Sequence, residues 1–187
     1  MTDNNFDRRR NALEETFFGK RNYELLEQMR QQLSQQEQRD ALSAASGVTD
    51  AAVLDHLVAC SIEPATLAAI AIVPLVQVAW ADGSVQKAER DAVMKAAAAA
   101  GVQTGDPSSV LLEHWLTEKP GDELFLAWQE YIGALGERMD TRARQIIRDD
   151  IVTRTRQVAS AAGGFLGMQK ISAPEQAVLD AIEKTFD

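Results

Sequence analysis

Residues 78–89 have the sequence Val78-Ala79-Trp80-Ala81-Asp82-Gly83-Ser84-Val85-Gln86-Lys87-Ala88-Glu89. An apolar segment ends here at an Asp-Gly pair, which favours a turn because glycine adopts left-handed backbone conformations at little steric cost. The glutamate that follows the turn is typical of the first turn of a helix. The stretch therefore predicts a helical hairpin with acidic groups at the turn between its helices, residues 80–86, which we call the elbow.

The segment before the elbow is apolar without interruption from Leu67 to Val76. Pro74 lies within this segment and Gln77 ends it, and the segment is shorter than the roughly 20 residues that a bilayer requires. These features argue against a membrane span. Pro64 suits the first turn of a helix, where a missing amide is tolerated. We therefore expect a helix that starts near Pro64 and is enclosed by other helices, and no transmembrane segment.

Capping residues and Gly or Pro stops recur along the rest of the chain. In the first part of the chain they predict helices over about residues 7–18 and 22–46, the second with a break at the capping-box sequence of residues 34–37. Two further helices are predicted to begin at Thr49 and at Asp106. The last three are predicted over about residues 121–135, 141–162 and 173–186. No segment shows the sustained alternation of apolar and polar residues that predicts a strand. The expected fold class is all-α, a compact helical bundle.

The chain changes in composition near Gly47. Residues 1–46 are rich in Gln, Glu and Arg and predict an N-terminal amphipathic helical arm, whereas residues 47–187 hold most of the apolar residues and predict the helical domain. Phe17, Phe18 and Tyr23 are the aromatic residues of the arm. They predict docking of the arm onto the domain, with a partner-binding surface as the alternative.

The net charge indicates which classes of partner the protein can bind, and the cysteine content bears on its cellular compartment. Acidic residues outnumber basic ones, 28 against 19, so the net charge of −9 disfavours binding to a nucleic-acid backbone and favours cations or basic protein surfaces. Cys60 is the one cysteine and has no internal partner for a disulfide. We expect a cytoplasmic protein, because residues 1–10 are polar and do not resemble a signal peptide.

The sequence pattern at the elbow is repeated weakly near the C-terminus. Val85 precedes Glu89 by four residues, as Ile171 precedes Glu175, and apolar helical positions follow in both places. This similarity predicts an internal duplication of the helical hairpin. Ser172 and Glu175 form a capping-box pattern, whereas Gln86 is a poorer cap, so we expect the first elbow to be the one with a chemical role.

Asp82-Gly83 with Glu89 matches the second half of a calcium-binding loop. The two earlier ligand positions fall on Val78 and Trp80, which have no side-chain oxygen, so a self-contained loop is excluded. A cation site would need further oxygen ligands, from Asp91 or from an acidic residue of the C-terminal half. The alternative is that Asp82 and Glu89 only cap backbone amides, each worth about 1 kcal/mol.

These residues, together with the later run Ala161-Ala162-Gly163-Gly164-Phe165-Leu166-Gly167 and Ile171, resemble the tellurite resistance TerB family and its TerB-like relatives. The resemblance covers about residues 64–186. It implies a compact, internally duplicated helical domain of the metal or chemical stress response, including tellurite, which binds a divalent cation (Ca, Mg or Mn) and works at a membrane-associated complex. Asp82 and Glu89 match the acidic positions of the first half and Glu175 that of the second, so the resemblance assigns these three as metal ligands. Gly163-Gly164 stands where a second Asp-Gly would be expected.

Three functions follow as hypotheses. The first is a non-enzymatic TerB-like module with a protein partner and a divalent cation at the elbow. The second is an interaction adaptor that acts through the arm. The third is a metal-dependent hydrolase that uses Asp82 and Glu89 as acid, base or metal ligands.

Other candidate sites have simpler interpretations. His56 and Cys60 are one helical turn apart, but zinc needs more ligands and His114 is distant in sequence, so a half-buried helical pair is expected. Five arginines lie along one predicted helix, interleaved with aspartates, and predict a solvated face with ion pairs, with a docking stripe for an acidic partner as the alternative. These arginines are Arg142, Arg144, Arg148, Arg154 and Arg156.

Overall fold

A computed structural model describes residues 29, 30, 32–162 and 171–186. All regular secondary structure in these ranges is helical, and they contain no strand. The predicted all-α fold class is therefore confirmed. None of the helices in the described ranges is long and apolar enough to cross a bilayer.

The chain divides into two compact units, residues 1–40 and 41–187. Residues 32–46 are helical, so the predicted break at residues 34–37 is wrong. The Gln, Glu and Arg residues around this capping-box sequence are good helix formers, and a helix continues through them. The helix ends as predicted before Gly47, which has a φ of +74°. The aromatic residues Phe17, Phe18 and Tyr23 of the predicted arm lie outside the described residues.

The elements that follow are α2 (Ala51–Ala59), the 3₁₀-helix η1 (Leu67–Ile72), α3 (Val73–Ala79), α4 (Lys87–Ala99), α5 (Pro107–Trp115), α6 (Asp122–Gly136), α7 (Thr141–Ala162) and α8 (Ala173–Lys184). The cap of α2 is Asp50, one residue after the predicted Thr49, and its Oδ1 accepts the amide of Ala52 at 2.9 Å. A carboxylate binds the free amides of a first turn well because the partial charge at a helix N-terminus is positive.

The enclosed apolar helix is confirmed in position but not in length. Residues 64–66 form turns, residues 67–72 form η1, and the α-helix begins only at Val73. Pro74 occupies the first turn of α3, where it cannot donate an amide, so the preceding residues take up the tighter 3₁₀ geometry. Most residues of α3 are buried, as expected for a central helix.

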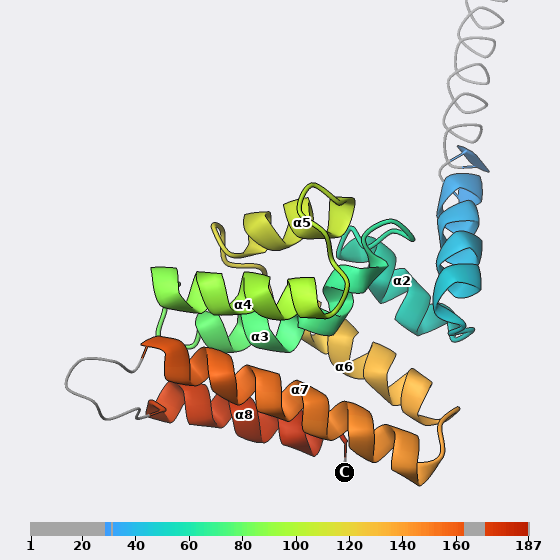
Figure 1. The fold of residues 1–187 in the computed structure, drawn as a ribbon. Coiled ribbons are helices and arrows are strands. Elements are labelled where there is room, and N and C mark those ends of the chain that lie inside the picture. The colour runs from blue at the N-terminus through green and yellow to red at the C-terminus, as the bar shows by residue number, and fades with distance from the viewer. Residues whose placement is uncertain (1–28, 31, 163–170, 187) are drawn as a thin grey trace, which may run out of the picture. The chain divides into compact units, whose positions relative to one another are not determined.

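Two helical hairpins form the main layer of the unit of residues 41–187. α3 packs against α4, α7 packs against α8, and α7 also packs along both α3 and α4. The C-terminal ends of α3 and α7 and the N-terminal ends of α4 and α8 lie at one end of this bundle (Figure 1). The arrangement agrees with the predicted repetition of one hairpin.

The remaining helices pack on the outside of the hairpins. α6 packs on α2 and α3, and α5 packs on η1 and α4. The largest buried side chain is Trp128 of α6, whose ring stacks on Phe125 and meets the edge of Phe186. Burial of aromatic rings of this size stabilises the junction between α6 and the C-terminus by several kcal/mol in total, at roughly 25 cal/mol per Å².

Candidate functional site

The elbow places Asp82 in solvent. Its Oδ1 accepts the amide of Ser84 at 3.0 Å, and Gly83 between them has a φ of +93°. This arrangement is an Asx turn, in which the short carboxylate closes a tight loop by binding the backbone two residues ahead. Asp82 therefore helps to form the turn that joins α3 to α4.

Glu89 and Glu175 occupy equivalent positions in the first turns of α4 and α8. Oε2 of Glu89 accepts the amide of Gln86 at 2.8 Å, and Oε2 of Glu175 accepts the amide of Ser172 at 2.5 Å. Both glutamates are buried, with exposed fractions of 2% and 6%. The prediction that Glu89 caps its helix less clearly than Glu175 is wrong, because the contact to the N-cap amide is present in both.

Asp82 and Glu175, two of the predicted metal ligands, both lie within electrostatic range of the third, Glu89. Burial raises the pKa of Glu89 above its ordinary value, the hydrogen bond from Gln86 opposes this rise, and the charges of Asp82 and Glu175 add to it. The fold therefore brings Asp82, Glu89 and Glu175 to one region. Asp91, the further ligand considered from the sequence, instead pairs with Lys87 at 2.6 Å.

Each of these three carboxylates already accepts a backbone amide. Nowhere in the described ranges do three or more His, Cys, Asp or Glu side chains form a group arranged to hold a metal ion. Divalent-cation binding by Asp82, Glu89 and Glu175 stays a prediction, and a cation would have to compete with or share these amide contacts.

The elbow is also fixed to α5. Nε1 of Trp80 donates to the carbonyl of Trp115 at 2.8 Å, and the guanidinium of Arg90 donates to the carbonyl of Leu116 at 2.5 Å. Both donors thus satisfy carbonyl groups at the end of α5, which have no partner within their own helix. No sequence pattern predicts either contact, because the sequence does not reveal which helix end lies beside the elbow.

Cys60 and His114 line one small pocket of about 240 Å³, together with Glu118, Lys119 and Glu123. Burial raises the pKa of the Cys60 thiol, and the charges of Glu123 and Glu130 raise it further. A raised pKa keeps the thiol protonated, which is the opposite of what a nucleophilic cysteine needs. The pocket therefore lacks an activated nucleophile.

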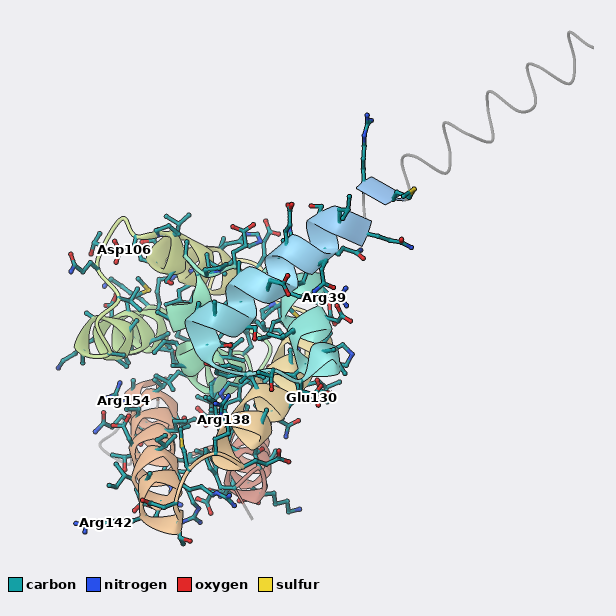
Figure 2. The ribbon with its side chains drawn as sticks, turned by 90° about the vertical axis from the view of Figure 1, so that its right-hand side faces the viewer. Arg39, Asp106, Glu130, Arg138, Arg142 and Arg154 are labelled. Carbon is teal, nitrogen blue, oxygen red and sulfur yellow. The ribbon has the colours of Figure 1, made fainter. Side chains whose placement is uncertain are left out.

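His56 does not pair with Cys60 as a ligand. Its Nδ1 lies 2.5 Å from Oε2 of Glu130, which joins α2 to α6 at the surface, and Figure 2 labels Glu130 on α6. The hydrogen bond to Glu130, and then its charge, raise the pKa of His56. This pair is a pH-sensitive contact between two helices.

An apolar groove of about 780 Å³ lies between η1, α3, α6 and α7. We call it the α6–α7 groove. Its lining residues are Ala45, Pro64, Leu67, Ala68, Ile70, Ala71, Ile72, Leu75, Ala100, Tyr131, Ile132, Leu135, Ile146, Ile147, Asp150, Ile151 and Arg154.

The groove exists because consecutive helices pack on different neighbours. α6 packs on α2 and α3, whereas α7 packs on α3, α4 and α8, so the side chains of α6 and α7 leave a slot between them. Ile146 stands at its rim with 61% of its surface exposed. An exposed isoleucine beside a large aliphatic cavity is typical of a binding surface.

Polar groups are few in this groove. Among its described lining residues only Asp150 and Arg154 are charged, and Nε of Arg154 donates to Oδ1 of Asp150 at 2.9 Å. Arg154 and Arg142 project from the same helix, α7 (Figure 2).

The predicted ion-paired face of α7 is present in part. Arg148 lies near Asp149 and Glu183, and Arg156 donates to Glu183 at 2.6 Å. Arg144 instead donates to the carbonyl of Gly136 at 2.6 Å. The arginine stripe is therefore only partly neutralised by acidic neighbours within the described part of the chain.

The sequence did not predict the α6–α7 groove. Ile146, Ile147 and Ile151 follow helical spacing, which predicts only that α7 has an apolar face. Whether that face is covered depends on where α6 lies, and the sequence does not show this. Comparison of the chain with family models, with curated proteins and with solved structures found no match.

Proposed function

We propose that the chain is a non-enzymatic binding module of TerB-like type whose α6–α7 groove receives an apolar group of a ligand or partner. The observation that carries this proposal is the 780 Å³ aliphatic groove with the exposed Ile146 at its rim. Ligand sites of about 300–1,000 Å³ that are mostly apolar, with a few polar groups, are the usual form of binding pocket.

The lining supports binding rather than catalysis. Its charged groups, Asp150 and Arg154, satisfy each other, and the remaining polar group of a titratable side chain is the hydroxyl of Tyr131. Burial raises the pKa of Tyr131, so this hydroxyl stays protonated at neutral pH and acts as a hydrogen-bond donor or acceptor only. These groups can orient a bound molecule.

Titration with 8-anilinonaphthalene-1-sulfonate tests the groove as a binding site. We expect saturable fluorescence enhancement at one site per chain, lost in Ile146→Glu because a carboxylate would then stand at the apolar rim. Leu126→Glu is the matched control, since Leu126 is also on a helix surface, 57% exposed, but does not line the groove. Absence of saturable binding, or equal binding by both variants, would refute the proposal.

A second candidate function is capture of a divalent cation at the elbow. The observation that favours it is the raised pKa of Glu89, to which the charges of Asp82 and Glu175 contribute. A cation beside these carboxylates would relieve their mutual repulsion and the cost of burying Glu89. The TerB-like resemblance supplies the setting for this candidate, a metal or tellurite stress response in the cytoplasm.

Calorimetry and thermal melting with Ca²⁺, Mg²⁺ and Mn²⁺ test this candidate. Asp82→Asn removes the charge but keeps a side-chain oxygen for the amide of Ser84, so we expect weaker ion binding with little loss of stability. Asp106→Asn is the matched control, because Asp106 accepts a local amide in the same way, at Gln103, away from the elbow. If none of the three ions produces heat of binding or a change in melting temperature, the cation site is excluded.

A further inference from the structure

Three residues of α7 line the outer edge of the α6–α7 groove, and Arg142 continues their row along the helix. Arg142, Ile146, Asp150 and Arg154 are spaced by four, so they form one row along the helix. Ile146, Asp150 and Arg154 line the cavity, and Ile147 and Ile151 line it from the next row inward. The row from Arg142 to Arg154 extends for about 18 Å at 1.5 Å per residue, which is the length of three helical turns.

The exposure of this edge indicates a large occupant. Pockets for small apolar molecules bury most of the ligand, about 70–90% of its surface. Here Ile146 remains 61% exposed at the rim, so a thin acyl chain lying on the floor of the groove would leave this side chain in water. A helix laid along the groove would cover the rim and the floor together, as in helix-in-groove recognition.

The charge around the groove differs from that of the whole chain. Residues 137–154 contain five arginines and four acidic residues, whereas the full sequence has a net charge of −9. Arg138 donates to the carbonyl of Gly47 and Arg144 to that of Gly136, and none of the described acidic side chains forms an ion pair with Arg138, Arg142 or Arg144. Arg142 thus continues the row of the groove's outer edge without an acidic partner among the described side chains.

Local charge decides which partner fits. At physiological ionic strength the Debye length is about 8 Å, so acidic groups elsewhere on the protein are screened more than the arginines beside the groove. We propose that the α6–α7 groove binds an amphipathic helix of a partner protein, with its apolar face against Ile146 and Ile151 and acidic residues beside Arg142 and Arg138. This inference rests on the proposed function and specifies the partner.

The test uses the full chain and a fluorescent 14-residue model peptide. Its leucines follow the three- and four-residue spacing of one helical face, and glutamate and glutamine fill the other positions. We expect one-to-one binding by fluorescence anisotropy, at least tenfold weaker in Ile146→Glu and unchanged in Leu126→Glu. Circular dichroism and melting curves establish that both variants are folded, which their exposed positions favour.

Charge recognition is tested by Arg142→Gln, for which we expect about threefold weaker binding and a smaller dependence on salt. Lys119→Gln is its matched control, because it changes the net charge equally at an exposed position that does not line the groove. Equal effects of the two variants would show that only net charge matters. Tighter binding of a peptide with lysine in place of glutamate would also overturn the proposed acidic partner.

Other occupants give distinct results. Light scattering that shows a dimer of the wild type and a monomer of Ile146→Glu would assign the groove to a second copy. Tighter peptide binding after Met29→Glu with Leu33→Glu would assign it to the chain's own arm, and displacement of the peptide by palmitate at lower concentration would assign it to an acyl chain. If anilinonaphthalene sulfonate binds and the acidic peptide does not, the helix proposal fails and the groove remains a binding site. If neither binds, both proposals fail.

Discussion

Glu89 and Glu175 each accept the amide of the residue three positions earlier, in the first turns of α4 and α8, and the charge of Glu175 contributes to raising the pKa of Glu89. The two hairpins thus place the same capping device at one end of the bundle. A buried carboxylate in this position stabilises the first turn of its helix, and the charge of Glu175 disfavours ionisation of Glu89.

The pH dependence of Glu89 follows from the direction of its pKa shift. The folded-state pKa of Glu89 is above the ordinary value of 4.5, so the folded protein holds the carboxyl proton more tightly than the unfolded chain does. The contribution of Glu89 to the free energy of unfolding therefore falls as the pH rises from 4.5 through the folded-state pKa. We expect Glu89→Gln to gain in free energy of unfolding relative to wild type between pH 4.5 and pH 7, by urea denaturation. A constant difference across this range would contradict the shift. Glu89→Ala, which also loses the cap, should be about 1–2 kcal/mol less stable than Glu89→Gln at any pH in this range.

The contact between His56 and Glu130 has a pH dependence of the same sign, but at higher pH. The pKa of His56 is raised by its hydrogen bond to Glu130, so the stabilisation is fully present below the ordinary value of 6.5 and is lost as the pH rises through the raised value. We expect the imidazole proton resonances of His56 to titrate above pH 6.5 in wild type and at lower pH in Glu130→Gln. An identical titration in the two proteins would show that Nδ1 and the Glu130 carboxylate do not interact in solution.

Trp80→Phe tests the attachment of the elbow to α5. The substitution removes the Nε1 donor and leaves the carbonyl of Trp115 without this partner, while most of the aromatic surface is kept. We expect a loss of about 1–2 kcal/mol in the free energy of unfolding, measured by urea denaturation. An unchanged value would mean that water replaces the indole without cost.

Alanine substitutions at two glycines compare the strain of a left-handed backbone conformation at the elbow with the effect of the same substitution inside a helix. Gly83 has a φ of +93°, which an alanine adopts only with strain, although no atom would meet its Cβ within 4 Å. Gly133 lies inside α6 and has equal space around it, without a positive φ. We expect Gly83→Ala to destabilise the protein by about 1–2 kcal/mol and Gly133→Ala to stabilise it by up to about 1 kcal/mol in thermal or urea unfolding. Changes of the same sign would refute this explanation.

Local signals in the sequence were enough for most helices. The bounds of α7 match the predicted range, and those of α6 and α8 differ by one or two residues at their ends, because capping residues and Gly or Pro stops act within one or two turns. The enclosed helix was misjudged at its start, where Pro74 and the packing of η1 against α5 replaced one long helix by two segments. A helix continues through the capping-box sequence at residues 34–37, so this sequence does not mark the start of a helix.

The residues of the candidate site were likewise predictable from the sequence only in part. Asp82, Glu89 and Glu175 could be selected from sequence because turn and capping patterns are local, and in the fold the charges of Asp82 and Glu175 both act on Glu89. The capping hydrogen bond of Glu175 is predicted directly from its capping-box pattern, whereas those of Asp82 and Glu89 are predicted as the alternative to cation binding. Cation binding by these carboxylates stays a prediction, which calorimetry with Ca²⁺, Mg²⁺ and Mn²⁺ tests.

The sequence by itself determined the helical class, the elbow and the capping glutamates, since each depends on residues a few positions apart. Only the tertiary structure decided that Trp80 reaches the end of α5, that His56 meets Glu130, and that Ile146 stands at the rim of a groove. The physical reason is that apolar periodicity specifies which face of a helix avoids water but not which other helix covers it. In this protein α6 and α7 pack on different neighbours, and one apolar face of α7 is left partly uncovered.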